Sequence, residues 1–207
     1  MAIKDFQKKS FLRSAESISA NYSYVDVADG TGVIEFYGAQ TYDTTNSTKY
    51  ILTTNSIYSN VPEIVNPSGT YNFDLSAFNL PRAIKGTAYF SVGMYMNTAA
   101  TNGYFITAKI QKSSGGVVTD CSSAFQGATL NSNGIWKMIL IAIPLTPTHF
   151  KKGDFLRLNL VVDGADNGEW AMGCDPTGRN GTYITSALVS PSMSTKLTLN
   201  IPFQIDT

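Results

Sequence analysis

The sequence predicts an all-β protein, and three observations carry that prediction. Ser, Thr and Asn together account for 57 of the 207 residues, and their side chains compete for the backbone hydrogen bonds that a helix needs. Several segments alternate apolar and polar residues with the two-residue period of a strand. Gly, Ser and Asn fill the connections between these segments, as is typical of β-sandwiches and barrels.

Strands are expected from about residue 31 onward. Residues 33–42 (VIEFYGAQTY) and 49–54 (KYILTT) are rich in β-branched and aromatic residues. Residues 86–97 and 103–112 also fit strands, and the short polar loop between them predicts a hairpin. The segment IWKMILIAIPLT is a continuous apolar run, which predicts a strand covered on both faces. The closing segment LTLNIPFQI alternates throughout, with its apolar residues on one face.

The connections favour a jelly-roll β-sandwich of about eight antiparallel strands. Residues 60–85 are expected to form a long connection, with two prolines bounding its first half, of the type by which a jelly roll passes between its sheets. We therefore expect a sandwich domain over residues 31–207, preceded by an N-terminal arm or anchor over residues 1–30. No repeat of fixed period is present in the sequence.

The stretch HFKKGDFLRLNLVVDG, residues 149–164, holds the only histidine of the sequence. It is either part of a catalytic site or a corner of the sheet. Leu156, Leu158, Leu160 and Val162 alternate with more polar residues, as in a strand with one buried face. A glycine before an aspartate predicts a turn, which places two lysines at an exposed tip. A catalytic histidine needs a nucleophile within reach, and the sequence has no Gly-x-Ser-x-Gly elbow. We therefore expect a sheet corner, no catalytic residue and no enzymatic activity.

The N-terminal segment differs from the rest of the chain. Ile3, Phe6, Phe11, Ala15 and Ile18 recur at roughly helical spacing among basic residues. A short amphipathic helix or an extended arm fits this pattern, packed loosely on its own domain or docked on a partner. In the second case Ile3, Phe6, Phe11 and Leu12 are the anchoring residues.

Charge and cysteine content narrow the function classes. The formal net charge is zero and only 14% of the residues are charged. The zero net charge argues against a basic nucleic-acid-binding surface. A surface with few charges favours association, so we expect the protein to be part of an assembly. The opening residues lack the apolar stretch of a secretory signal, and no segment approaches a membrane span. Cys121 and Cys174 are therefore expected to be reduced thiols. No cofactor is expected.

Two groups of residues fit either a ligand site or a purely structural role. Asp163, Asp166 and Glu169 share one loop and could bind calcium, but Ala165 stands where an EF-hand requires a third ligand, so a solvated turn is favoured. Exposed aromatic residues could bind a sugar or a neighbouring subunit. The residues considered for such ligand or subunit contacts are Tyr89, Tyr95, Tyr104 and Trp170, with Arg179 in the turn-rich loop at 172–181.

The C-terminal half resembles a known class of protein. The succession HFKKGDFLRLNLVV, a loop with CDPTGR and a closing strand LTLNIPFQID is similar to jelly-roll auxiliary virion proteins of tailed bacteriophages, of the head-decoration or head-fibre type. The resemblance covers about residues 85–206. It implies a module added to a capsid lattice, often as a trimer, with the N-terminal segment as the attachment and with assembly in the host cytoplasm.

The function expected from the sequence is therefore that of a capsid decoration protein in the virion. Its partners would be the major capsid protein or another virion protein, and copies of itself, with no nucleic acid and no membrane. The alternative is a carbohydrate- or receptor-binding knob of a phage tail fibre, with an open aromatic groove and calcium in the loop around Asp163.

Overall fold

The fold was analysed in a computed structural model of the 207-residue chain. The structure describes residues 10–12, 17–19, 32–42, 48–54, 63–65, 68–96, 103–130, 135–164, 170–174 and 197–205. Within these ranges the chain is all-β, and no helix is present. None of the described segments is a helix long and apolar enough to cross a membrane.

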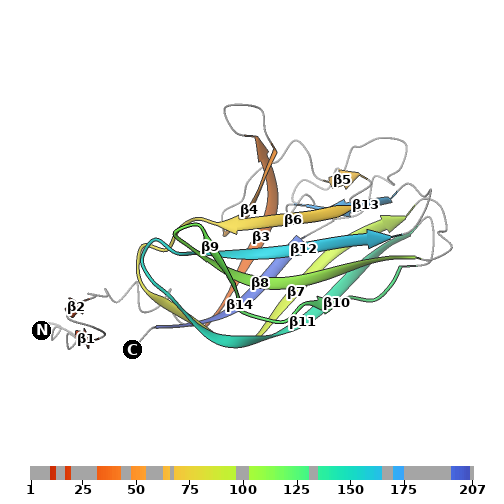
Figure 1. The fold of residues 1–207 in the computed structure, drawn as a ribbon. Coiled ribbons are helices and arrows are strands. Elements are labelled where there is room, and N and C mark those ends of the chain that lie inside the picture. Colours follow the sequence, from red (N-terminus) through yellow and green to blue (C-terminus); the bar gives the residue numbers. More distant parts are fainter. Residues whose placement is uncertain are drawn as a thin grey trace, which may run out of the picture.

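Fourteen strands follow one another along the chain (Figure 1). They are β1 (Ser10–Leu12), β2 (Ser17–Ser19), β3 (Gly32–Tyr42), β4 (Thr48–Thr53), β5 (Glu63–Val65), β6 (Gly69–Leu75), β7 (Arg82–Met96), β8 (Tyr104–Ser114), β9 (Val117–Asp120), β10 (Phe125–Gln126), β11 (Ile135–Phe150), β12 (Phe155–Gly164), β13 (Trp170–Gly173) and β14 (Leu197–Ile205).

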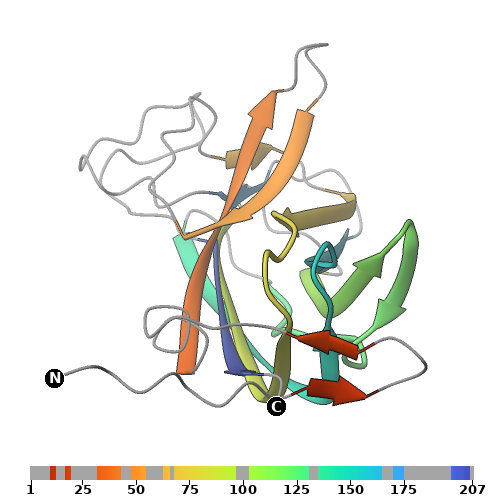
Figure 2. The ribbon, with the colours of Figure 1, turned by 90° about the vertical axis from the view of Figure 1, so that its left-hand side faces the viewer.

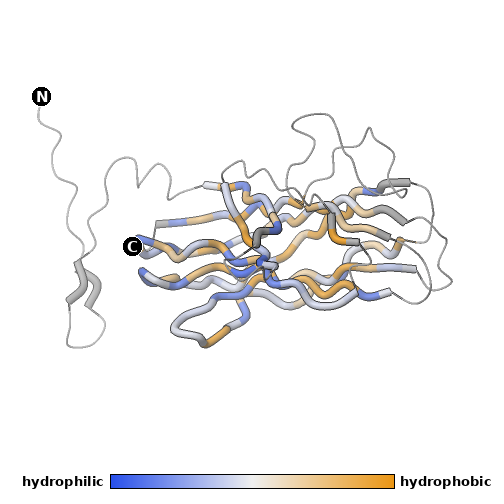
Figure 3. Tube along the Cα trace, turned by 90° about the horizontal axis from the view of Figure 1, so that it is seen from above, coloured by the Kyte–Doolittle hydropathy of each residue, from blue (hydrophilic) through white to orange (hydrophobic). Residues whose placement is uncertain are grey.

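Twelve of these strands form one continuous hydrogen-bonded sheet that folds into two layers (Figures 1 and 3). The first layer has the order β6-β12-β8, with β9 and β10 along β8. The second layer has the order β3-β14-β7-β11, with β4 along β3 and with β13 and β5 continuing beyond β7. A short parallel pairing of β4 with β6 joins the two layers at one edge.

The core lies between the layers, because every long strand alternates inward and outward residues. Leu156, Leu158, Leu160 and Val162 are at most 1% exposed, as the alternation predicts. The inner residues of β7 and β14 meet them, and the fully buried aromatic side chains are Phe73, Phe90 and Phe150 (0% exposed). The predicted alternation of β7, β12 and β14 is therefore confirmed.

The segment after β9 closes the second edge of the two layers. Cys121 N–H donates to the Ile110 carbonyl in β8, and the Cys121 carbonyl accepts from Thr146 N–H in β11. The Cys121 side chain is fully buried there. Cys121 and Cys174 are both buried free thiols, which confirms the expectation from the sequence.

Four sequence predictions about the strands are wrong. The loop at 97–102 does not join a hairpin, because β7 pairs with β11, β13 and β14, whereas β8 lies in the other layer against β12. Strand β11 is not covered on both faces, since Met138 and Leu140 are 56% and 66% exposed. The strands also exceed eight, and β4–β6 is parallel. The predicted connection over residues 60–85 contains strands β5 and β6 and the start of β7.

Residues Ser10–Leu12 and Ser17–Ser19 correct the expectation of a helix in this segment, because both are strands. They form an antiparallel pair, with Phe11 directly opposite Ile18. This two-stranded sheet shares no strand with the twelve-stranded one (Figure 2). Ile3 and Phe6 lie outside the described residues, and so does the boundary near residue 30.

Candidate functional site

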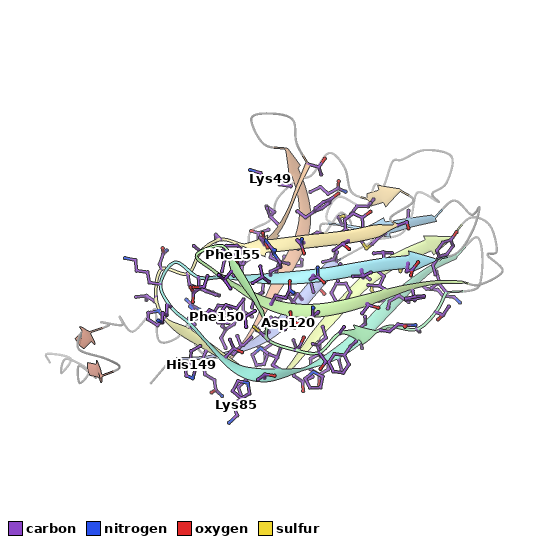
Figure 4. All side chains as sticks on the ribbon, viewed as in Figure 1. Lys49, Lys85, Asp120, His149, Phe150 and Phe155 are labelled. Atoms are coloured by element: carbon purple, nitrogen blue, oxygen red, sulfur yellow. The ribbon has the colours of Figure 1, made fainter. Side chains whose placement is uncertain are left out.

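The corner between β11 and β12 is structural, as the sequence predicts. Gly153 has a positive φ of 91°, and Lys151 and Lys152 are exposed at the tip. Phe150 is fully buried beneath the corner and packs edge-on against Phe78 at 5.1 Å between ring centroids (Figure 4). The loop before β7 is tied to this corner, since Phe78 N–H donates to the Asp154 carbonyl and Gly153 N–H donates to the Phe78 carbonyl.

Asp154 is the charged centre of this corner. Its side chain is 6% exposed, accepts a hydrogen bond from Lys151 N–H at 2.7 Å and pairs with Lys112 Nζ at 2.8 Å. Burial by itself raises the pKa of Asp154, but hydrogen bonds from Lys112, Ser114 and Lys151 and the charge of Lys112 outweigh it, so the pKa is lowered. The Lys112 ammonium also donates to the His149 carbonyl at 2.6 Å, so this lysine joins β8 to both sides of the corner.

The outer face of the first layer is a ladder of paired polar side chains. Arg157 in β12 makes two hydrogen bonds to Asp74 in β6, at 2.6 and 2.8 Å, and Asn159 donates to Asn72 at 2.8 Å. The Asp74 carboxylate raises the pKa of Arg157. Lys109 and Gln111 in β8 both reach Asp120 in β9. Such a face satisfies its polar groups within the chain and is suited to water.

The first layer also exposes Val117 (67%) and Val118 (43%) in β9 and Val161 (39%) in β12, but the outer face of the second layer exposes larger apolar side chains. Large apolar side chains stand exposed there: Leu140 (66%), Met138 (56%) and Tyr89 (48%), with Val33 (66%) at the far edge. We call the outward residues of β11, β7, β14 and β3 the apolar face. Its members in β11 are Met138, Leu140, Ala142 and Pro144, in β7 Thr87, Tyr89, Ser91 and Gly93, in β14 Thr198, Asn200 and Pro202, and in β3 Val33, Glu35 and Tyr37.

The strand register makes this face continuous. Leu140 lies opposite Ser91, which lies opposite Thr198, which lies opposite Tyr37. The next row contains Ala142, Tyr89, Asn200 and Glu35 in the same way. Ser91 and Thr198 share a hydrogen bond of 2.7 Å, and Glu35 accepts one from the Tyr37 hydroxyl at 2.8 Å. These two bonds pair four of the polar side chains within the chain, and Glu35 is the one charged residue among the members named above.

A groove opens beside the apolar face, where β4 leaves β3 to join β6. Its volume is about 780 Å³. Strand β3 supplies one wall, and the segment from Leu75 to Arg82 supplies the other. Phe36, Phe78 and Phe203, all buried, form its apolar lining. The Arg82 guanidinium lies about 6 Å from the ring centroids of Phe78 and Phe203.

The aromatic residues predicted to contact a ligand do not converge. Tyr89 is on the apolar face, but Tyr104 is only 2% exposed, which corrects its assignment to a surface contact. Tyr104 packs against Gly164 of the neighbouring strand, where an added Cβ would overlap its ring. The side chains of Tyr95 in β7 and Trp170 in β13 lie outside the description, as does Arg179.

The candidate calcium loop is only partly described. The Asp163 carboxylate is exposed and accepts a hydrogen bond from Gly164 N–H at 2.8 Å, which is a local turn contact. Asp166 and Glu169 lie outside the described residues. Among the residues that are described, no three His, Cys, Asp or Glu side chains lie close enough together to hold a metal ion.

Comparisons with known proteins begin at the level of sequence. No protein-family model matches the chain. No curated protein matches it either.

Solved structures match the chain at low identity and with TM-scores below 0.5. A CocE/NonD family hydrolase from Staphylococcus aureus has a TM-score of 0.49 at 12% identity over 95% of this chain and 40% of its own. An α-amino acid ester hydrolase has a TM-score of 0.46 at 11% identity over 82% and 34%. Infectious bursal disease virus, Gt strain, has a TM-score of 0.31 at 14% identity over 97% and 42%. The chain thus spans less than half the length of these structures.

These comparisons correct one expectation from the sequence. Hydrolases are among the structures most similar to the chain, which contradicts the expectation that the protein has no enzymatic activity, and we withdraw it. The same likeness assigns no reaction to this chain, because every TM-score is below 0.5 and no identity exceeds 14%.

Proposed function

We propose that this protein is an auxiliary virion protein of a tailed bacteriophage, built on a jelly roll. The strand order supports the jelly roll. Of the eight body strands β3, β6, β7, β8, β10, β11, β12 and β14, the second layer holds the first, eighth, third and sixth. The first layer holds the second, seventh, fourth and fifth. This interleaving of two Greek keys is the jelly-roll pattern, which recurs in viral capsid and lectin domains.

In this proposal the apolar face is where the protein meets its neighbours. The contrast between the two outer faces is the observation that carries it. One face pairs its charges within the chain, whereas the other exposes Leu140, Met138 and Tyr89. Contiguous exposed apolar side chains mark protein contact surfaces, and few charges belong at the centre of an interface.

The proposed assembly is a homotrimer bound to the capsid lattice. The N-terminal arm, with Ile3, Phe6, Phe11 and Leu12, supplies the attachment to neighbouring virion proteins, the major capsid protein first among them. Assembly takes place in the host cytoplasm, and the mature location is the virion. Burial of apolar area on the neighbour provides the free energy of attachment, at about 25 cal/mol per Å² before ordering costs.

Sedimentation of a matched pair of variants tests this use of the apolar face. Leu140→Lys places a charge on the apolar face at one of its two most exposed side chains, and Val161→Lys places one on the outer face of the first layer, where Val161 is 39% exposed. We expect wild type and Val161→Lys to associate alike and Leu140→Lys to associate at least tenfold more weakly, because a lysine there must be desolvated. Equal association of both variants, or a wild type that remains monomeric at every soluble concentration, contradicts the proposal.

Attachment to the particle is tested by occupancy. Deletion of residues 1–20 should lower the number of copies on the native particle, which electron microscopy counts directly. Unchanged occupancy after the deletion contradicts the role of the arm.

A further inference from the structure

The first half of β3 has an open edge. Residues Gly32–Tyr37 pair with β14 on one side. On the other side β4 pairs with β3 only from Tyr37 onward, and β4 then joins β6. Among the described residues nothing pairs with this side of β3 between Gly32 and Phe36, and the groove runs along it.

Pro202 fixes which backbone groups face the open edge. In the β3–β14 ladder Val33 lies opposite Pro202, which has no N–H to donate. The Val33–Pro202 pair therefore cannot exchange hydrogen bonds, and Val33 directs its N–H and C=O away from β14. Backbone groups alternate with a two-residue period, so Glu35 presents its N–H and C=O to the groove as well.

The groove beside this edge accommodates the side chains of an added strand. Alternate side chains of a strand paired with Val33 and Glu35 would point between the layers, towards Phe36, Phe78 and Phe203. The intervening side chains would extend the apolar face. An open edge with an apolar floor is the arrangement by which proteins bind an extended segment through strand addition.

We infer that the segment Ser10–Ser19 of a second copy of this chain occupies the groove and pairs with the open edge of β3. The inference rests on the proposed function, since it names the partner in self-association. It moves Phe11 and Leu12 from the capsid attachment proposed above to a neighbouring copy and leaves Ile3 and Phe6 for the attachment.

Two observations select this occupant. The β1–β2 pair is a two-stranded sheet separate from the main one, and such a hairpin is marginally stable in water by itself. It carries Phe11, Leu12 and Ile18 in sequence, which suit the aromatic floor of the groove. Within the described residues the β1–β2 pair is therefore not joined to a larger sheet, and the first half of β3 has no strand on its open side. Each copy of the chain carries both features.

Strand addition between copies also determines which symmetry the assembly can have. The donor segment and the acceptor edge are different surfaces, so the contact is head-to-tail. Such a contact closes into a ring when the rotation permits, which agrees with the proposed trimer.

The test compares two substitutions at one exposed position in the full-length chain. Glu35→Pro removes the edge N–H and no hydrogen bond to β14, and proline is tolerated on edge strands. Glu35→Ala removes the same carboxylate and keeps the N–H, so it is the matched control. We expect Glu35→Pro to weaken association by about tenfold or more, because a carbonyl of the added strand loses its donor. Glu35→Ala should associate as wild type does, and equal association of the two variants overturns the inference.

Hydrogen exchange on the wild-type chain tests the edge without any substitution. The amides of Val33 and Glu35 should be protected in the associated state and should exchange rapidly on dilution. Equal exchange in both states overturns the inference, whether the amides are always protected or always exposed.

A double variant tests the donor segment. Phe11→Ser with Ile18→Ser should lose association and the protection of Val33 and Glu35 together. Unchanged association and protection overturn the choice of donor. A Leu140→Lys variant that dissociates while Glu35→Pro stays associated leaves the apolar face intact as an interface and refutes only the strand addition.

Discussion

Substitution of Asp154 is expected to destabilise the fold far more than substitution of a comparable surface aspartate. Asp154→Asn removes the partner of Lys112 Nζ, which lies 2.8 Å away, and weakens the acceptor for Lys151 N–H. Both side chains are mostly buried, at 6% and 18% exposure. A charge-assisted hydrogen bond and a broken, largely buried ion pair together predict a loss of about 2–4 kcal/mol in the free energy of unfolding.

Asp120→Asn is the matched control. Asp120 also accepts from a lysine, Lys109 at 3.1 Å, and from a second donor, Gln111 at 2.8 Å. Its side chain is 53% exposed, and pairs of that kind contribute about 0–1 kcal/mol. The two variants therefore share their chemistry and differ in burial.

Urea unfolding provides the measurement, with the midpoint and the slope compared among the three proteins. Because the folded pKa of Asp154 is lowered, its contribution is present above the unfolded pKa of about 3.9 and is lost as the pH falls through the folded value. The difference in stability between wild type and Asp154→Asn should accordingly shrink as the pH falls below about 4 and disappear once the pH is below the folded pKa of Asp154. If Asp154→Asn lowers the free energy of unfolding at neutral pH no more than Asp120→Asn does, the Asp154–Lys112 pair does not stabilise the corner as described.

Two further predictions follow from the packing. Gly164→Ala should lower the free energy of unfolding by about 1–3 kcal/mol, since the new methyl group overlaps the Tyr104 ring; an unchanged urea midpoint contradicts this packing. Cys121 and Cys174 are buried, and burial raises the pKa of Cys121, so both thiols should resist a maleimide reagent in the native protein and react once guanidinium unfolds it. Rapid labelling of the native chain, followed by mass spectrometry, contradicts that prediction.

The sequence predicts most of the strands because their inner faces alternate without interruption. In β12 and β14 every outward position after Phe155 is polar, valine or proline, so the buried phase is unambiguous. The corner at Gly153 is also predicted, since a glycine and an aspartate side by side leave few other conformations. These features are local, and local chemistry determines them.

The wrong predictions concern features that are not local. In β11 the outward residues Met138, Leu140 and Ala142 are apolar like the inward ones. The sequence of β11 therefore shows no two-residue alternation of apolar and polar residues. The pattern of a surface that meets a partner is the same as that of a strand covered on both faces. The burial of Tyr104 is equally hard to predict from the sequence, because it depends on Gly164. This glycine is sixty positions away in the chain and lies opposite Tyr104 in the neighbouring strand of the same layer.

The open edge of β3 has no signal in the sequence. It exists because β4 leaves β3 and pairs with β6, and this path depends on how the two layers pack together. Only the position of Pro202 opposite Val33 could have suggested which backbone groups point outward, and that requires the register.

Oxidation of Met138 tests the central claim most directly. Met138 is 56% exposed on the apolar face, and Met94 is 1% exposed in the core; peroxide converts accessible methionine to the sulfoxide. If the apolar face is the contact surface, mass spectrometry will find Met138 oxidised quickly in the dilute chain and protected in the associated one, with Met94 protected in both. Oxidation of Met138 at the same rate in both states contradicts the account.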